Sequence, residues 1–156
     1  MTPEDNKELI RRFMQAFNER DRDAMRPMVA DDVNYGGVDA ERFLDIEFAW
    51  CELFPDLRMQ IDGMIAEDDR VAFRWTFIGT HTQRPTPGGL LAPKTPTGEH
   101  ADSIGAVLAS LPPTGTRVDI PGMSEARIEN GRIAEWWGEW RSLSLYQQLG
   151  ARLSLP

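Results

Sequence analysis

The spacing of apolar residues divides the chain into an N-terminal part with helical periodicity and a later part with strand periodicity. Residues 3–20 predict an amphipathic helix, because their apolar side chains recur three or four positions apart. Thr2 can cap this helix, and Pro3 suits its first position. A second, short helix is expected over 23–29, and a third after Asp39. The apolar face of the first helix carries Leu9, Ile10, Phe13, Met14 and Phe17, and that of the third carries Phe43, Ile46, Trp50 and Phe54.

Further along the chain, apolar residues alternate with polar ones, which is the period of a half-buried strand. This alternation occupies 57–61 and 71–78 on either side of the acidic turn AEDDR, and so predicts an antiparallel hairpin. It returns over 117–141 around the dipeptide Asn-Gly at 130–131, which strongly favours a hairpin turn. Helices followed by hairpins predict a single α+β domain over 1–156. A curved, mainly antiparallel sheet wrapped on the helices would leave a concave apolar pocket.

A Pro/Gly-rich segment at about 84–112 separates the two hairpins as an insertion between central strands. Six of the eleven prolines fall between residues 83 and 116. Long irregular segments inside compact domains are often lids or binding loops. The sequence leaves a lid, an interface arm and a disordered excursion open. Outside this segment, 33–39 is expected to form a brief strand or turn, and 143–153 a short helix.

Composition and charge narrow the class of partner and the location. The 156 residues suit one domain. A net charge of -8 without a Lys/Arg cluster argues against a nucleic-acid partner. No apolar run approaches the roughly 18 residues of a membrane span, and the polar start MTPEDNKELIRR is unlike a signal peptide. The single cysteine, Cys51, excludes an intrachain disulfide and favours a reducing, cytoplasmic location.

Three tryptophans lie within the eight residues EWWGEWRS at 135–142. If Gly138 faces the concave side, the strand period of two makes Trp136 and Trp140 face it as well. On the neighbouring strand, Ser124 would face the same way. Small residues opposite large indoles would form a flat slot for an aromatic or polycyclic ligand. The alternative is that the indoles only pack the core.

Six segments carry a resemblance to a known family: FNERD at 17–21, LFPDLRMQI at 53–61, DRVAFRWTFIGTHT at 69–82, PPTGTRV at 112–118, RIENGRIAEWW at 127–137 and LYQQLG at 145–150. In this order they resemble the SnoaL-like polyketide cyclases and related ester cyclases, within the nuclear transport factor 2-like superfamily. The resemblance implies a cone-shaped sheet on three N-terminal helices, a pocket between the layers, and an outer sheet face that often forms a homodimer. It also implies closure of a polyketide ring by aldol condensation, without a metal or an organic cofactor.

The chain departs from this family at the residues that carry the chemistry. The resemblance puts Gly138 where the cyclases have an aspartate and Ser124 where they have a histidine, and Arg141 replaces a common acidic residue. Glycine cannot move a proton, and serine is a poor base near pH 7. The expected function is therefore a cofactor-independent cyclase, isomerase or dehydratase for a small hydrophobic, polyketide-like carbonyl compound in secondary metabolism, without the usual acid–base pair. The alternatives are a binding or accessory protein that uses the same pocket, and a structural dimerisation module.

The candidate catalytic residues are His81 and Tyr35. His81 follows a strand in IGTHT, near the expected pocket mouth, and histidine carries protons at neutral pH. Relatives also carry GTH, so a role in the turn is the alternative. The Tyr35 phenol could donate a hydrogen bond to a carbonyl or enolate oxygen, or be buried for structural reasons. His100, in the insertion, would reach a ligand only if that segment closed.

The candidate substrate-binding residues are Trp136, Trp140, Ser124, Gly138, Met14 and Arg74. Inside the pocket, the charge of Arg74 would need a carboxylate partner, either Asp32, Glu135 or an acidic ligand. A surface salt bridge is the alternative. No metal site is expected, because the chain has only two separated histidines, one cysteine and no HExxH motif.

Overall fold

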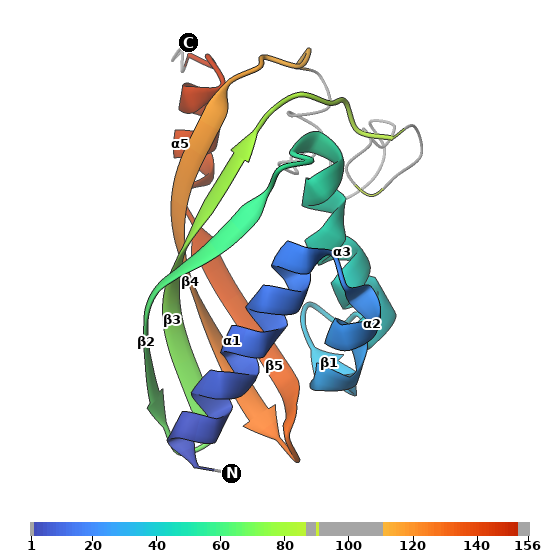
Figure 1. Cartoon of the computed structure of the whole chain (residues 1–156), viewed down its shortest axis with the longest axis vertical. Helices are drawn as coiled ribbons and strands as arrows, with labels where there is room; N and C mark the ends of the chain where they lie inside the picture. Colours follow the sequence, from blue (N-terminus) through green and yellow to red (C-terminus); the bar gives the residue numbers. More distant parts are fainter. Residues whose placement is uncertain (1, 87–89, 91–110, 153–156) are drawn as a thin grey trace.

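One curved sheet with two long helices packed against it forms the body of the protein (Figure 1). The computed structural model describes residues 2–86, 90 and 111–152. In chain order the elements are α1 (Pro3–Glu19), α2 (Arg22–Met25), the 3₁₀ helix η1 (Arg26–Met28), β1 (Val29–Asn34), α3 (Ala40–Leu53), β2 (Arg58–Glu67), β3 (Arg70–Thr80), β4 (Arg117–Glu129), β5 (Arg132–Trp140) and α5 (Ser142–Gln148). The α+β fold class expected from the sequence is confirmed.

The sheet has five strands in the order β1-β5-β4-β3-β2. Strand β1 runs parallel to β5, and the other neighbours are antiparallel, so the sheet is mainly antiparallel as expected. Both predicted hairpins are present. Asp68 in the first turn, and Asn130 and Gly131 in the second, have positive φ angles of 49°, 50° and 76°. These conformations suit tight hairpin turns.

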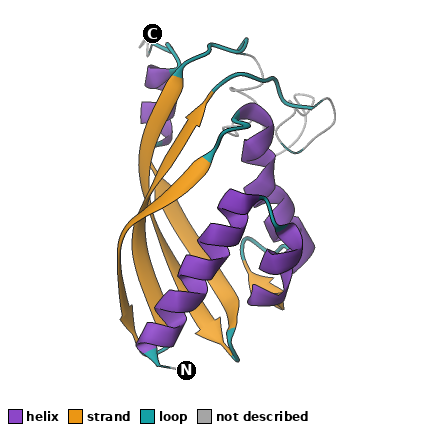
Figure 2. Cartoon of the chain, in the orientation of Figure 1, coloured by secondary structure: helices purple, strands orange, loops and turns teal. Residues whose placement is uncertain are grey.

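The two faces of the sheet differ in burial because successive side chains of a strand point to opposite sides. On β3, the buried line is Val71, Phe73, Trp75 and Phe77. The helices α1 and α3 lie on one side of the strands, as Figure 2 shows. These apolar side chains and the apolar faces of the helices share one core cluster.

The helix starts follow their expected caps, but the second helix is shorter than expected. Thr2 accepts a hydrogen bond from the Asp5 N–H at 3.2 Å, and Asp39 caps α3 in the same way. The expectation of one helix over 23–29 is wrong: α2 ends at Met25, a 3₁₀ turn follows, and β1 begins at Val29. Pro27 has no backbone N–H and so cannot continue the α-helical hydrogen bonds.

Asn18, near the end of α1, fixes this helix to the edge strand β2. Its side-chain amide donates to the Met59 carbonyl at 2.9 Å, and its side-chain oxygen accepts from the Met59 N–H at 2.8 Å. The side chain thus pairs with the strand as a neighbouring backbone would. This contact holds α1 at the height where Met14, Phe17 and Met59 border a cavity.

The insertion expected at about 84–112 leaves the end of β3 and returns to the start of β4. Its central part, 87–89 and 91–110, lies outside the described residues. His100 belongs to this part, so its role and that of the segment as a lid stay predictions. In the part of the chain that the structure describes, no helix is long and apolar enough to span a membrane.

We expect Asn18→Ala to destabilise the fold by about 1–3 kcal/mol, because two backbone groups of Met59 lose their partners. This corresponds to a fall in melting temperature of about 3–10 °C, measured by calorimetry. Gln15→Ala is the matched control, since Gln15 lies on the same helix and its side chain, within the described part of the chain, bonds to Glu19 alone at the surface. Equal melting temperatures for the two variants would contradict the role of Asn18.

Candidate active site

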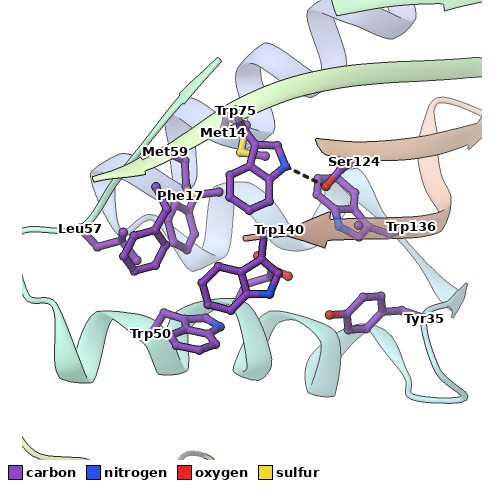
Figure 3. A pocket seen from close by; sticks show the side chains of 13 residues that line it. Met14, Phe17, Tyr35, Trp50, Leu57, Met59, Trp75, Ser124, Trp136 and Trp140 are labelled. Atoms are coloured by element: carbon purple, nitrogen blue, oxygen red, sulfur yellow. Dashed lines mark hydrogen bonds between the residues drawn. The ribbon is translucent and has the colours of Figure 1, made fainter. Parts of the chain in front are cut away.

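A cavity of about 130 Å³ lies between α1, α3 and the concave face of the sheet. The cavity is not closed off from solvent. Four of its lining residues are only half-buried: Tyr35, Glu47, Trp50 and Trp140. We call this part the open side of the cavity. Figure 3 shows side chains from the helices and from the sheet converging on this space. The complete lining is Met14, Phe17, Tyr35, Glu47, Trp50, Leu57, Met59, Trp75, Phe77, Ser124, Trp136, Gly138 and Trp140.

The tryptophan cluster lies as the strand period predicts. Trp136, Gly138 and Trp140 border the cavity, whereas Trp137 points away from it and is 54% exposed. The register of β4 and β5 shifts between Arg127 and Ile128, which are paired with Glu135 and Ile133. This irregularity precedes the tryptophans along β5, so their alternation is unbroken.

The two inward tryptophans have different surroundings. Trp136 is buried against Phe13, Phe43 and Phe73, with ring-centroid distances of 5.4–5.7 Å. Trp140 is half-buried and meets Trp50 edge to face at 5.1 Å. Trp136 is thus both core and cavity wall, which combines the two interpretations of the sequence. Trp140 belongs to the outer part of the cavity.

Glu47 on α3 is a cavity residue that the sequence interpretation missed. It is the one acidic side chain in the lining, and burial raises its pKa to about 7. Among the described residues, no hydrogen bond or ion pair to its carboxylate is formed. The signal was present in the sequence: Glu47 follows Phe43 by four positions and precedes Trp50 by three, so it lies on the apolar face of the helix.

Tyr35 lies close enough to Glu47 for the two groups to influence each other. Burial, and then the negative charge of Glu47, raise the pKa of Tyr35 to about 12. The phenol therefore keeps its proton throughout the neutral range and remains a hydrogen-bond donor. Its ring meets Phe43 edge to face at 5.0 Å.

Ser124 and Trp75 form the polar part of the sheet-side wall. The indole N–H of Trp75 donates a hydrogen bond to the Ser124 hydroxyl oxygen at 2.9 Å (Figure 3). Ser124 is only 2% exposed. Trp75 was expected only as one apolar residue of a strand, and its contact with Ser124 gives it a second role.

His81 lies outside the cavity, so the expectation that it reaches a ligand there is not supported. It is fully buried, with its ring 5.4 Å from that of Phe54. Its Nδ1 accepts from the Thr114 N–H at 3.4 Å, and its backbone bonds to Gly115 and Thr116. These contacts join the end of β3 to the segment that leads into β4. They agree with the alternative that His81 has a structural role in the turn.

Arg74 also lies outside the cavity, on the exposed outer face of the sheet. The buried line of β3 includes its neighbours Phe73 and Trp75, so strand alternation turns Arg74 outward. Its charge lowers the pKa of Asp62, after the larger effects of the Thr76 and Gln60 hydrogen bonds. Arg74 is therefore a surface residue, but among the described residues it forms none of the salt bridges that the surface interpretation expected. The other six candidates, Met14, Tyr35, Ser124, Trp136, Gly138 and Trp140, share the cavity.

A family model described as SnoaL-like polyketide cyclase matches residues 7–149. The chain belongs to this family. Comparison with curated proteins gave no match. In the part of the chain that the structure describes, no group of three or more His, Cys, Asp or Glu residues is arranged to hold a metal ion.

Solved structures with the same fold come from several bacteria. AclR, a putative hydroxylase from Streptomyces galilaeus, is 23% identical with a TM-score of 0.72, over 99% of this chain and 87% of that one. TsrD from Streptomyces laurentii is 22% identical with a TM-score of 0.73, over 97% and 99%. IdmH, a putative polyketide cyclase from Streptomyces antibioticus, is 21% identical with a TM-score of 0.69, over 94% and 99%. These likenesses confirm the nuclear transport factor 2-like fold.

We expect Glu47→Gln to stabilise the protein at pH 8. Because the folded pKa of Glu47 is raised to about 7 from 4.5, its stability contribution is complete below pH 4.5 and is lost as the pH rises through 7. The full shift corresponds to about 3 kcal/mol, and the open side of the cavity reduces this to about 1–2 kcal/mol. The variant should therefore melt about 2–8 °C higher at pH 8, with a much smaller difference at pH 5. A difference independent of pH would contradict the assignment.

Proposed function

We propose that this protein is a cofactor-independent enzyme of the cyclase or isomerase type, acting on a small hydrophobic carbonyl compound in a biosynthetic pathway. The observation that carries the proposal is Glu47, a single carboxylate with a pKa of about 7 inside an aromatic cavity. Groups with pKa values near the working pH are efficient general bases. The single cysteine agrees with a cytoplasmic location.

In this proposal Glu47 breaks a C–H bond next to the substrate carbonyl and takes the proton, while the bond electrons pass to the carbonyl oxygen as an enolate. Tyr35, which keeps its proton because its pKa is about 12, donates a hydrogen bond to this oxygen as the negative charge of the enolate develops, and not to the oxygen of the bound ketone. If the substrate has a C=C bond in the β,γ position, the resulting dienolate takes the proton back at its γ-carbon, which is an isomerisation. Alternatively, the enolate carbon attacks a second carbonyl of the same molecule, which forms a C–C bond, leaves an alkoxide and closes a ring. In the second case Glu47 returns the proton to the new alkoxide.

The size of the cavity limits the substrate. An apolar cavity of about 150 Å³ holds one benzene ring, and this one measures about 130 Å³. We therefore propose a substrate with one ring in the cavity and any remaining part at the open side beside Trp50 and Trp140. Four indoles line the space, at residues 50, 75, 136 and 140, and can hold a planar ring by stacking.

A second candidate function is binding without turnover. It is favoured by one observation: neither Ser124 nor Gly138, the positions where the family resemblance implies the acid–base pair, has a side chain that ionises near neutral pH. Exchange of substrate α-protons separates the two functions, since only an enzyme would catalyse it.

We expect the protein to catalyse deuterium exchange at the α-carbons of 2-indanone in D₂O, followed by NMR, with a rate that rises with pH through about 7 as Glu47 loses its proton. Glu47→Gln should slow exchange at least about 100-fold, and Tyr35→Phe at least about tenfold. Glu52→Gln should keep the wild-type rate, since Glu52 lies on the same helix outside the cavity. Binding of 2-indanone without exchange would favour the second candidate.

We also propose that the protein forms a homodimer through the outer face of the sheet. Ile65, Met123 and Trp137 are 75%, 45% and 54% exposed on this face, on strands β2, β4 and β5. Large apolar side chains gathered on one exposed face are typical of interaction surfaces.

Trp137→Glu should convert the dimer into a monomer, because it places a charge in an apolar contact beside Glu125, its partner on β4. Trp137→Phe should remain dimeric. Size-exclusion chromatography with light scattering measures both. A monomeric wild type, or two variants with the same mass as the wild type, would rule out this interface.

A further inference from the structure

The Trp75–Ser124 pair has a hydrogen-bonding capacity that the proposed mechanism does not use. Ser124 accepts the indole N–H of Trp75 at 2.9 Å, and both side chains are buried and border the cavity. A serine hydroxyl that accepts one hydrogen bond still has its own proton to donate. Among the hydrogen bonds of the described residues, none has the Ser124 hydroxyl as donor. A buried donor with no acceptor is costly, so the site is suited to a ligand that supplies one.

A glycine opposite Trp75 fixes the position of the indole. Trp75 is paired with Gly122 on β4. A Cβ atom at Gly122 would come within 2.4–2.8 Å of three atoms of the indole ring. Gly122 does not have a positive φ angle, so space and not backbone conformation requires glycine here. The indole lies against the bare backbone of β4, with its N–H at Ser124.

A second glycine fixes the position of the hydroxyl. Gly138 on β5 is paired with Ser124, and a Cβ atom there would lie 2.8 Å from the Ser124 hydroxyl oxygen. Gly138 also lacks a positive φ angle. A side chain at 138 would therefore push the Ser124 hydroxyl away from Trp75. Two glycines on two strands thus maintain one hydrogen bond at the cavity wall.

We propose that Ser124 donates a hydrogen bond to the carbonyl oxygen of the ligand, and that Trp75, Gly122 and Gly138 are positioning residues for this donor. The indole N–H polarises the Ser124 hydroxyl and so makes it a stronger donor than an isolated serine. The proposal rests on the proposed function and deepens it by assigning the oxygen-binding atom to the sheet side of the cavity that Glu47 lines from α3. An oxygen held at Ser124 would place the rest of the ligand ring among the tryptophans, toward the helix wall.

The test compares two ligands of the same shape, 2-indanone and 2-methyleneindane, which differ only in C=O against C=CH₂. Ligand-observed NMR titration gives both dissociation constants without requiring turnover. The wild type should prefer the ketone about tenfold, the effect of one hydrogen bond. Ser124→Ala and Ser124→Cys should remove this preference, because cysteine keeps the shape but is a weak donor. Neither variant should change the affinity for 2-methyleneindane more than about twofold.

The positioning residues give a graded result in the same titration. Trp75→Phe should reduce the ketone preference to about threefold, because the hydroxyl remains but is no longer polarised. Gly138→Ala should remove it, because the added methyl displaces the hydroxyl. Equal losses for both ligands in all variants would show a packing role only and would overturn the proposal, as would an unchanged preference in Ser124→Ala. The two experiments test different proposals. Loss of the ketone preference tests the role of Ser124 in binding, whereas deuterium exchange tests the role of Glu47 in catalysis, so either can fail without the other.

Discussion

The desolvated carboxylate of Glu47, a half-buried residue, is the constraint on which the site depends. It lies on the apolar face of α3 between Phe43 and Trp50, and burial raises its pKa to about 7. A charge in such a place destabilises the folded state unless it is paired or protonated. The surrounding core, with Phe13 and Phe73 packed on Trp136, supplies the stability that allows it. A destabilising group held inside a well-packed structure is typical of a functional site.

The ionisable side chain of the cavity lies on a helix and not on the sheet. The family resemblance implies ionisable residues at 124 and 138, on neighbouring strands. Here Ser124 and Gly138 are paired, and among the described residues the only carboxylate that lines the cavity is that of Glu47 on α3. The change is not a simple loss, because Gly138 leaves the space that the Ser124 hydroxyl needs to bond with Trp75. Under the proposed function, a base on the helix and a donor on the sheet would hold the ligand from two sides.

The sequence was sufficient for the elements and the faces of the strands, but not for the chemistry. Alternation along β5 correctly oriented Trp136 and Trp140, since the register shift precedes them. Alternation along β3 allows Arg74 to face either the cavity or the outer side. The packing of Phe73 and Trp75 in the core shows that Arg74 faces the outer side. His81 lies at a strand end, where the period no longer tells which way a side chain points. Glu47 was not predicted because helical periodicity places it beside apolar residues of α3 without showing whether its carboxylate reaches water or a cavity.

Differences in packing determine where the cavity can accommodate a larger ligand. Trp136 is held by three phenyl rings and is 7% exposed, so that movement of its ring would disturb the core shared by α1, α3 and β3. Trp140 is half-buried and is held by edge contacts with Trp50 and by Phe77. Rotation of an indole at the surface side costs less packing than displacement of one in the core. Under the proposed function, the inner wall would therefore set the plane of the ligand ring, and a larger substrate would be accommodated where Trp50 of α3, the helix of Glu47, meets Trp140 of β5.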